Sequence, residues 1–146
     1  MRFIAAAILA IAATASASAV QRRTDYGYWD FTGSCSFPAS GYKSYRVAAT
    51  YHNAEIADPI EVTCSYLYSP PDKSVAASCS DPSFSYDFGH VGMATPVTNV
   101  TLKQTVGLWG SQVTVTGVKE LEFDFSGGSG RSGTASGVVE AQTGTA

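Results

Sequence analysis

The sequence carries little charge: only 14% of its 146 residues are Asp, Glu, Lys or Arg, and it has two histidines and three cysteines. Bases are outnumbered by acids, 9 against 12, so the chain lacks the positive charge that a phosphate backbone attracts, and we expect no nucleic-acid partner. Low charge combined with 12% aromatic residues also excludes an intrinsically disordered chain.

Long apolar runs are absent except at the N-terminus, where residues 1–19 have the three parts of a secretory signal peptide. Arg2 provides the positive charge, Phe3–Ala13 the apolar stretch, and Ala17-Ser18-Ala19 the small residues before cleavage. The apolar stretch is shorter than the roughly 20 residues that span a bilayer. We therefore predict a secreted, extracellular protein with no membrane contact after cleavage.

Residues 20–24 form a short segment before the domain and contain the dibasic pair Arg22-Arg23. The pair is either a second processing site or part of a flexible terminus, and the sequence leaves both open. Cleavage after Ala19 leaves 8 bases against 12 acids, and cleavage after Arg23 leaves 6 against 12. The exported domain is acidic in both cases.

Residues 25–142 alternate between apolar and polar positions in many short segments. Within Ile60–Tyr68 every second side chain, beginning with Ile60, is apolar and these side chains share one face of a strand. Leu121, Phe123 and Phe125 alternate in the same way farther along. Gly, Pro and Asp clusters separate these segments. We predict an all-β fold, a single small antiparallel β-barrel or sandwich of roughly nine strands without substantial helix, and a frayed C-terminus at 143–146.

The three cysteines suggest one disulfide. Cys64 and Cys79 lie in strand-like segments that Pro70-Pro71-Asp72 can turn back on each other, so we expect them to pair in an oxidising compartment. Cys35 is then unpaired. It is either a buried, inert thiol or the site of an intermolecular disulfide that makes a homodimer.

Catalytic motifs are not evident, and we expect a protein without enzymatic activity, metal or cofactor. His52 and His90 have no metal-ligand spacing, and the serines form no Gly-x-Ser-x-Gly elbow. Glu120, Glu122 and Asp124 alternate with apolar residues, which indicates the solvent face of one strand rather than a pair of glycosidase acids. The glycine-rich run at 127–133 lacks the Lys-Ser/Thr ending of a phosphate loop and is interpreted as a connecting loop.

Two residues are candidates for surface chemistry. Asn99-Val100-Thr101 is a glycosylation sequon, and its use is left open because sequons inside strands are often unmodified. Trp109, on a turn flanked by Gly107 and Gly110, is the best single candidate for an exposed aromatic contact.

Several segments in order resemble one known family. They are Asp25-Tyr26-Gly27-Tyr28-Trp29-Asp30-Phe31, Tyr42–Asn53, Val62-Thr63-Cys64, Ser78-Cys79, Phe84-Ser85-Tyr86-Asp87-Phe88 and Leu102-Lys103-Gln104. Together they are similar to the Alt a 1 family of fungal allergens and effectors, which are small secreted β-barrels. The resemblance is weakest between Gly107 and Ser132.

The resemblance implies a secreted, non-enzymatic effector or elicitor that acts by binding a host protein of the plant extracellular defence, and so a role in virulence. The alternative is a cell-wall carbohydrate-binding module or small glycoside hydrolase that uses the aromatic faces and the acidic row. A groove holding two carboxylates, or a planar row of exposed aromatic rings, would favour the alternative.

Overall fold

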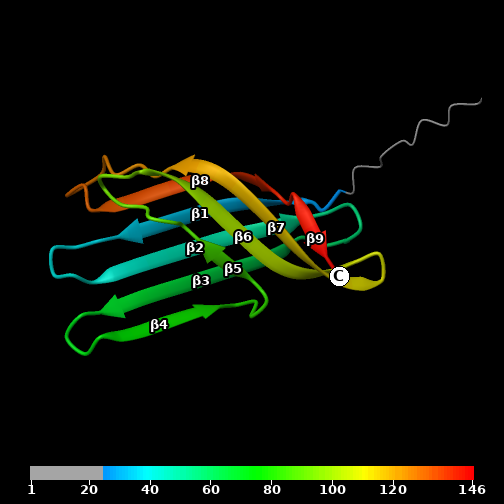
Figure 1. The fold of residues 1–146 in the computed structure, drawn as a ribbon, viewed down its shortest axis with the longest axis horizontal. Helices are drawn as coiled ribbons and strands as arrows, with labels where there is room; N and C mark the ends of the chain where they lie inside the picture. The colour runs from blue at the N-terminus through cyan, green and yellow to red at the C-terminus, as the bar shows by residue number, and fades with distance from the viewer. Residues whose placement is uncertain (1–24) are drawn as a thin grey trace, which may run out of the picture.

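The computed structural model describes residues 25–146, so the predicted signal peptide and the segment 20–24 lie outside the described residues. The described chain forms nine β-strands and no helix (Figure 1). Their order is β1 Tyr28–Ser36, β2 Lys43–His52, β3 Ile60–Ser69, β4 Ser74–Cys79, β5 Ser85–Asp87, β6 Val97–Leu108, β7 Ser111–Glu122, β8 Ser132–Glu140 and β9 Thr143–Thr145.

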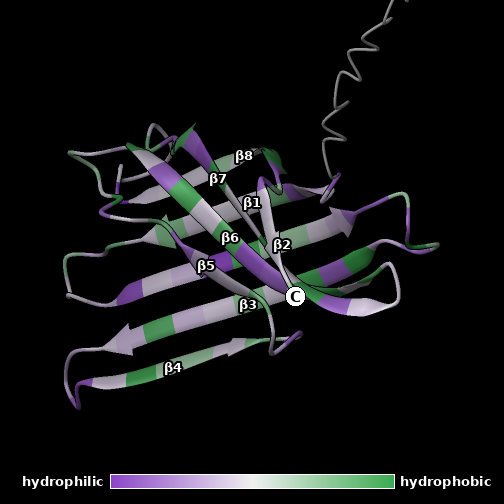
Figure 2. Cartoon of the chain, turned by 45° about the vertical axis from the view of Figure 1, so that its right-hand side comes forward, coloured by the Kyte–Doolittle hydropathy of each residue, from purple (hydrophilic) through white to green (hydrophobic). Residues whose placement is uncertain are grey.

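The strands form two antiparallel sheets. One sheet has the order β4-β3-β2-β1-β8 and the other β5-β6-β7-β9. The second sheet lies across the first and leaves β4 uncovered in both ribbon views (Figures 1 and 2). The two sheets remain separate, so the prediction of an all-β fold is confirmed as a sandwich and not as a closed barrel.

Alternation along the strands builds the core between the two sheets. Bands of apolar and polar colour follow one another along β6 (Figure 2), where Val100, Leu102, Val106 and Leu108 are buried. The largest fully buried side chains from the facing sheet include Trp29 and Tyr51. Burial of these apolar and aromatic surfaces is the main force that holds the sheets together.

The chain crosses from one sheet to the other between β7 and β8. Asp124 and Thr134 exchange backbone hydrogen bonds of 2.8 and 3.2 Å there, which ties the loop to the start of β8. Glu120, Glu122 and Asp124 are exposed on the outer side, as the alternation predicts.

The prediction that residues 143–146 fray is wrong for the strand β9. Thr143–Thr145 pairs with Thr114–Thr116 of β7, and the side chain of Gln142 exchanges hydrogen bonds of 3.0 and 3.3 Å with the backbone of Val118. A Cβ added to Gly144 would lie 2.3 Å from the ring of Tyr26. The terminal strand is therefore held by backbone pairing and by a close aromatic contact that only glycine permits.

Candidate functional site

One end of the sandwich gathers segments that are distant in the sequence. They are residues 25–28 before and at the start of β1, the β2–β3 loop at 53–59, the β6–β7 turn at 109–110 and residues 140–142 after β8 (Figure 1). We call this region the Trp109 end. It carries two hollows and two of the exposed large aromatic side chains of the described chain.

Trp109 occupies a strained position at the tip of the β6–β7 hairpin. Leu108 pairs with Ser111, so the turn has only two central residues, and both have positive φ: +52° for Trp109 and +76° for Gly110. This is the type I′ turn, for which Asn-Gly is the preferred sequence. A bulky residue at the first position costs conformational energy, and here its side chain is 51% exposed. The predicted exposure of Trp109 is confirmed.

The ring of Tyr26 packs against the ring of Trp109. The two rings meet edge to face with centroids 6.1 Å apart, a favourable geometry for aromatic pairs. Tyr26 is itself fixed, because the Tyr51 hydroxyl donates a hydrogen bond to its carbonyl oxygen. The indole of Trp109 thus packs against an anchored aromatic neighbour although half of its surface faces solvent.

Tyr28 and His52 stack on the outer face of the larger sheet. Their ring centroids lie 4.9 Å apart at an interplanar angle of 18°, since the two residues are directly opposite in the β1–β2 pairing. His52 Nε2 lies 2.9 Å from Asp30 Oδ2, close enough for an ion pair. The His52 ring is not aligned for a hydrogen bond to the Asp30 carboxylate, so Nε2 has no hydrogen-bond partner.

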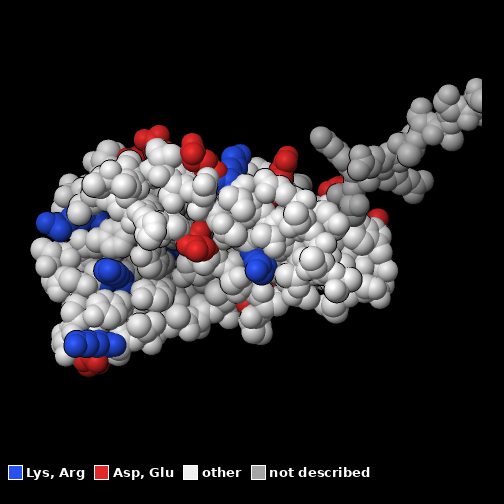
Figure 3. Space-filling view, viewed as in Figure 1, with Lys and Arg blue, Asp and Glu red and all other residues white. Residues whose placement is uncertain are grey.

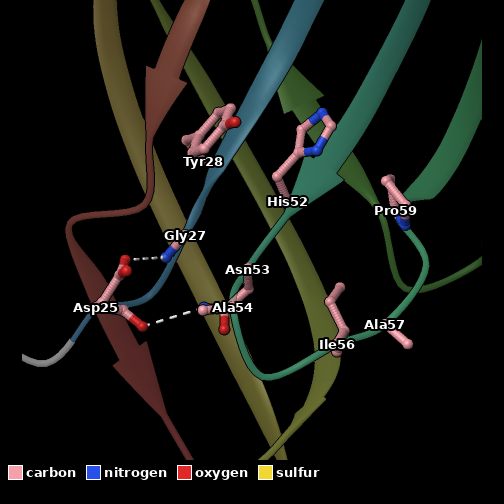
Figure 4. A pocket seen from close by; sticks show the side chains of 9 residues that line it. All are labelled: Asp25, Gly27, Tyr28, His52, Asn53, Ala54, Ile56, Ala57 and Pro59. Carbon is pink, nitrogen blue, oxygen red and sulfur yellow. Dashed lines mark hydrogen bonds between the residues drawn. The ribbon is translucent and has the colours of Figure 1, made fainter.

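Beside this stack lies a hollow of about 390 Å³, lined by Tyr28, His52 and the β2–β3 loop (Figure 4). The loop is tied to the N-terminal segment because Asn53 Nδ2 donates to the Asp25 carbonyl oxygen over 3.1 Å. Asn53 Oδ1 also accepts from the Glu55 amide at 2.8 Å. A second hollow of about 670 Å³ lies on the other side of Tyr28, against residues 140–142.

Charge is distributed unevenly between the two ends. Figure 3 shows basic side chains at the left and in the middle of the visible face, where acidic side chains also lie, and only acidic side chains at its far right end. Lys43, Lys73 and Arg131 lie at the end opposite Trp109. The acids of the strands and loops that form the Trp109 end are Asp25, Asp30, Glu55, Asp58, Glu61 and Glu140. The Trp109 end is therefore both aromatic and acidic.

Behind this surface, a buried polar chain connects the two sheets. The Trp29 indole Nε1 donates to Gln104 Oε1 over 2.8 Å, and Gln104 Nε2 donates to Asp81 Oδ2 over 2.9 Å. Gln104 is fully buried. Burial raises the pKa of Asp81, but hydrogen bonds from Gln104 and Ser83 lower it more, leaving it below the ordinary value. Alternation alone predicts Gln104 on the inner face of β6, but not the partners that make its burial tolerable.

The predicted disulfide is confirmed by the structure. Cys64 and Cys79 form a disulfide with their Cα atoms 4.1 Å apart, directly opposite in the β3–β4 pairing. Cys35 is free and 2% exposed, and burial raises the pKa of its thiol while a hydrogen bond with the Gly133 backbone lowers it. The structure thus shows Cys35 as a buried thiol, and the homodimer stays a prediction. A homodimer through Cys35 requires that the side chain first leave the core.

The other sequence candidates lie apart from the Trp109 end. Asn99 is exposed on the outer face of β6, opposite Glu120, so a glycan there would point into solvent. His90 is exposed in the loop between β5 and β6. Within residues 25–146, no group of three or more His, Cys, Asp or Glu side chains is placed to hold a metal ion. The described residues also contain no helix of the length and apolarity that a membrane span requires.

No protein-family model matches the chain, and neither the curated proteins nor the solved structures contain a match to it. The resemblance to the Alt a 1 family rests on the segments quoted above and stays a prediction.

Proposed function

We propose that this domain is an exported, non-enzymatic binding protein whose Trp109 end recognises a basic surface on an extracellular host protein. The single observation that carries the proposal is Trp109, a half-exposed indole held at a position where the backbone favours Asn or Gly. Strain at an exposed side chain persists when the side chain has a use that outweighs it.

The surroundings of Trp109 suit a protein partner. Tryptophan and tyrosine are the residues that most often anchor protein interfaces, and Tyr26 limits the entropy that the indole loses on binding. The acidic side chains around it, with Lys43, Lys73 and Arg131 far away, would steer a basic partner towards this end. The disulfide supports a location outside the reducing cytosol.

The proposal is tested by capture from plant extracellular fluid on immobilised mature protein, with insoluble polysaccharides tested in parallel. We expect a protein partner that binds wild type, binds Trp109→Asn at least ten-fold more weakly, and binds a Glu55→Gln, Asp58→Asn variant more weakly at low salt. Val97→Thr is the matched control, because Val97 is 49% exposed near the opposite end. Retention by polysaccharide alone, or a partner indifferent to Trp109, would contradict the proposal.

The hydrolase alternative has less support. Of its three candidate acids, Glu120 and Glu122 are exposed on β7 and Asp124 is exposed just beyond the end of that strand, so they do not face one another across a groove. Glycosidase acids flank their substrate from two sides. Carbohydrate binding without hydrolysis concerns a different part of the molecule.

A further inference from the structure

Another hollow, of about 230 Å³, opens between the two sheets far from the Trp109 end. It is lined by Tyr45 of β2, Tyr66 of β3, Tyr86 and Asp87 of β5, and the following Phe88 and Gly89. This volume is below the roughly 300–1,000 Å³ of sites for drug-sized ligands. It suits one small ring rather than an extended molecule.

The register of the sheets explains why the tyrosine rings are accessible. Tyr45 pairs with Tyr66, and Tyr66 pairs with Ala77 of β4, so three side chains form one row on the inner face of the larger sheet. Ala77 is too small to cover the Tyr66 ring, and the second sheet stops short of β4. Tyr86 reaches the same hollow from the opposite sheet.

Hydrogen-bonding groups surround this aromatic floor. Burial is the main cause that raises the pKa of the Tyr45 and Tyr86 hydroxyls above the ordinary value. Both hydroxyls are therefore neutral at physiological pH and can donate and accept. Asp87 is exposed, and its Oδ1 accepts from the Gly89 amide over 2.6 Å, which holds the carboxylate at the rim.

The shape and chemistry select the ligand class. No Lys or Arg lines the hollow, so anionic ligands are disfavoured by Asp87. Tyr45 and Tyr66 are tilted by 47° with centroids 5.2 Å apart, so they form no parallel-walled slot for a flat aromatic molecule. A puckered ring with C–H groups on one face and hydroxyls at its edge matches tilted aromatic walls with phenol and carboxylate groups at the rim.

We propose that this hollow binds one pyranose unit of a neutral oligosaccharide, with its C–H face against the tyrosine rings and its hydroxyls donating to Asp87. The proposal is independent of protein binding at the Trp109 end. It assigns a binding role only, because Asp87 is the single carboxylate lining the hollow and a glycosidase site uses a pair.

The test is an NMR titration of ¹⁵N-labelled mature protein with cellotetraose, chitotetraose and laminaritetraose in turn. We expect at least one of them, at millimolar concentration, to shift the backbone amides of Tyr66, Tyr86, Asp87 and Gly89. Asp87→Asn, which keeps the size but removes the charge, should weaken binding about ten-fold, the value of a hydrogen bond to a charged group. Tyr66→Ala should weaken it by more.

Two comparisons keep the result unambiguous. Tyr28→Ala removes an exposed tyrosine at the Trp109 end and should leave saccharide affinity unchanged, whereas Asp87→Asn should leave host-protein capture unchanged. If Tyr66→Ala fails to fold, Tyr86→Phe tests the same hollow by removing one hydroxyl only. The proposal is overturned if none of the three tetrasaccharides shifts these amides, if shifts occur elsewhere, or if Asp87→Asn binds as tightly as wild type.

Discussion

Replacing Trp109 separates the conformational cost of its position from the contacts that its side chain makes. Trp109→Ala and Trp109→Asn both remove the edge-to-face contact with Tyr26, which is worth about 0.5–1.5 kcal/mol. They differ in the backbone, because asparagine tolerates φ near +52° and alanine does not.

The expected difference between the two variants follows from the turn. A left-handed conformation costs an L-residue roughly 1–2 kcal/mol, and Asn-Gly is the preferred type I′ sequence. We therefore expect Trp109→Asn to be about 1 kcal/mol more stable than Trp109→Ala. For a domain of this size, that difference corresponds to about 4 °C in Tm.

Urea denaturation followed by far-ultraviolet circular dichroism measures the free energies of unfolding, with Gly110→Ala as a control for the same turn. Gly110 has φ +76° and nothing within 4 Å of an added Cβ, so alanine there should cost about 1 kcal/mol through backbone strain alone. Equal stability of Trp109→Ala and Trp109→Asn, with Gly110→Ala destabilised as expected, would refute strain at Trp109. It would also remove the observation on which the proposed function rests.

Four further predictions concern the interior and the disulfide. Gln104→Leu should lower the free energy of unfolding by about 1–3 kcal/mol in urea titrations, because a buried indole N–H loses its acceptor. Burial raises the pKa of Asp81, but its hydrogen bonds lower the pKa below the ordinary value. The ionised Asp81 carboxylate therefore stabilises the fold above about pH 4, and this stabilisation is lost as the pH falls through the folded pKa. In denaturation measured at several pH values, Asp81→Asn should make the free energy of unfolding fall less steeply at acid pH. The double variant Cys64→Ala, Cys79→Ala should lose about 3 kcal/mol in the same assay, and a loss near zero would contradict a loop-closure role. Cys35 should react with a thiol reagent only after unfolding, and fast labelling of the folded protein would contradict its burial.

The strands were predictable because their signal is local. Side chains in a strand alternate between faces, so Val62, Cys64 and Tyr66 predict one inner face without any information from the rest of the chain. The disulfide was predictable for a similar reason, since a Pro-Pro-Asp turn between two strand-like segments brings Cys64 and Cys79 together by hairpin geometry. Trp109 was identifiable from the glycines around it.

Features that depend on how the sheets meet were not predictable. A barrel and a sandwich have the same alternation, and the choice depends on whether the edge strands pair, which is a long-range property. The strand Thr143–Thr145 was predicted to fray because three residues carry no periodic signal, yet β7 offers a free edge there. Gln104 and Asp81 are 23 residues apart, and no spacing rule connects them.

The disulfide holds the edge strand β4 beside Tyr66 of β3. β4 is the one strand of the larger sheet that buries almost none of its residues, so apolar burial cannot hold it in place. The bond between Cys64 and Cys79 fixes it covalently to β3, which keeps Ala77 beside the Tyr66 ring. Reduction should therefore loosen β4, the neighbour of Tyr66 in the sheet, before it affects the core around Trp29. Hydrogen exchange of the Ala76 and Ser78 amides, which face β3, compared before and after reduction with that of Val100, distinguishes this local release from global unfolding.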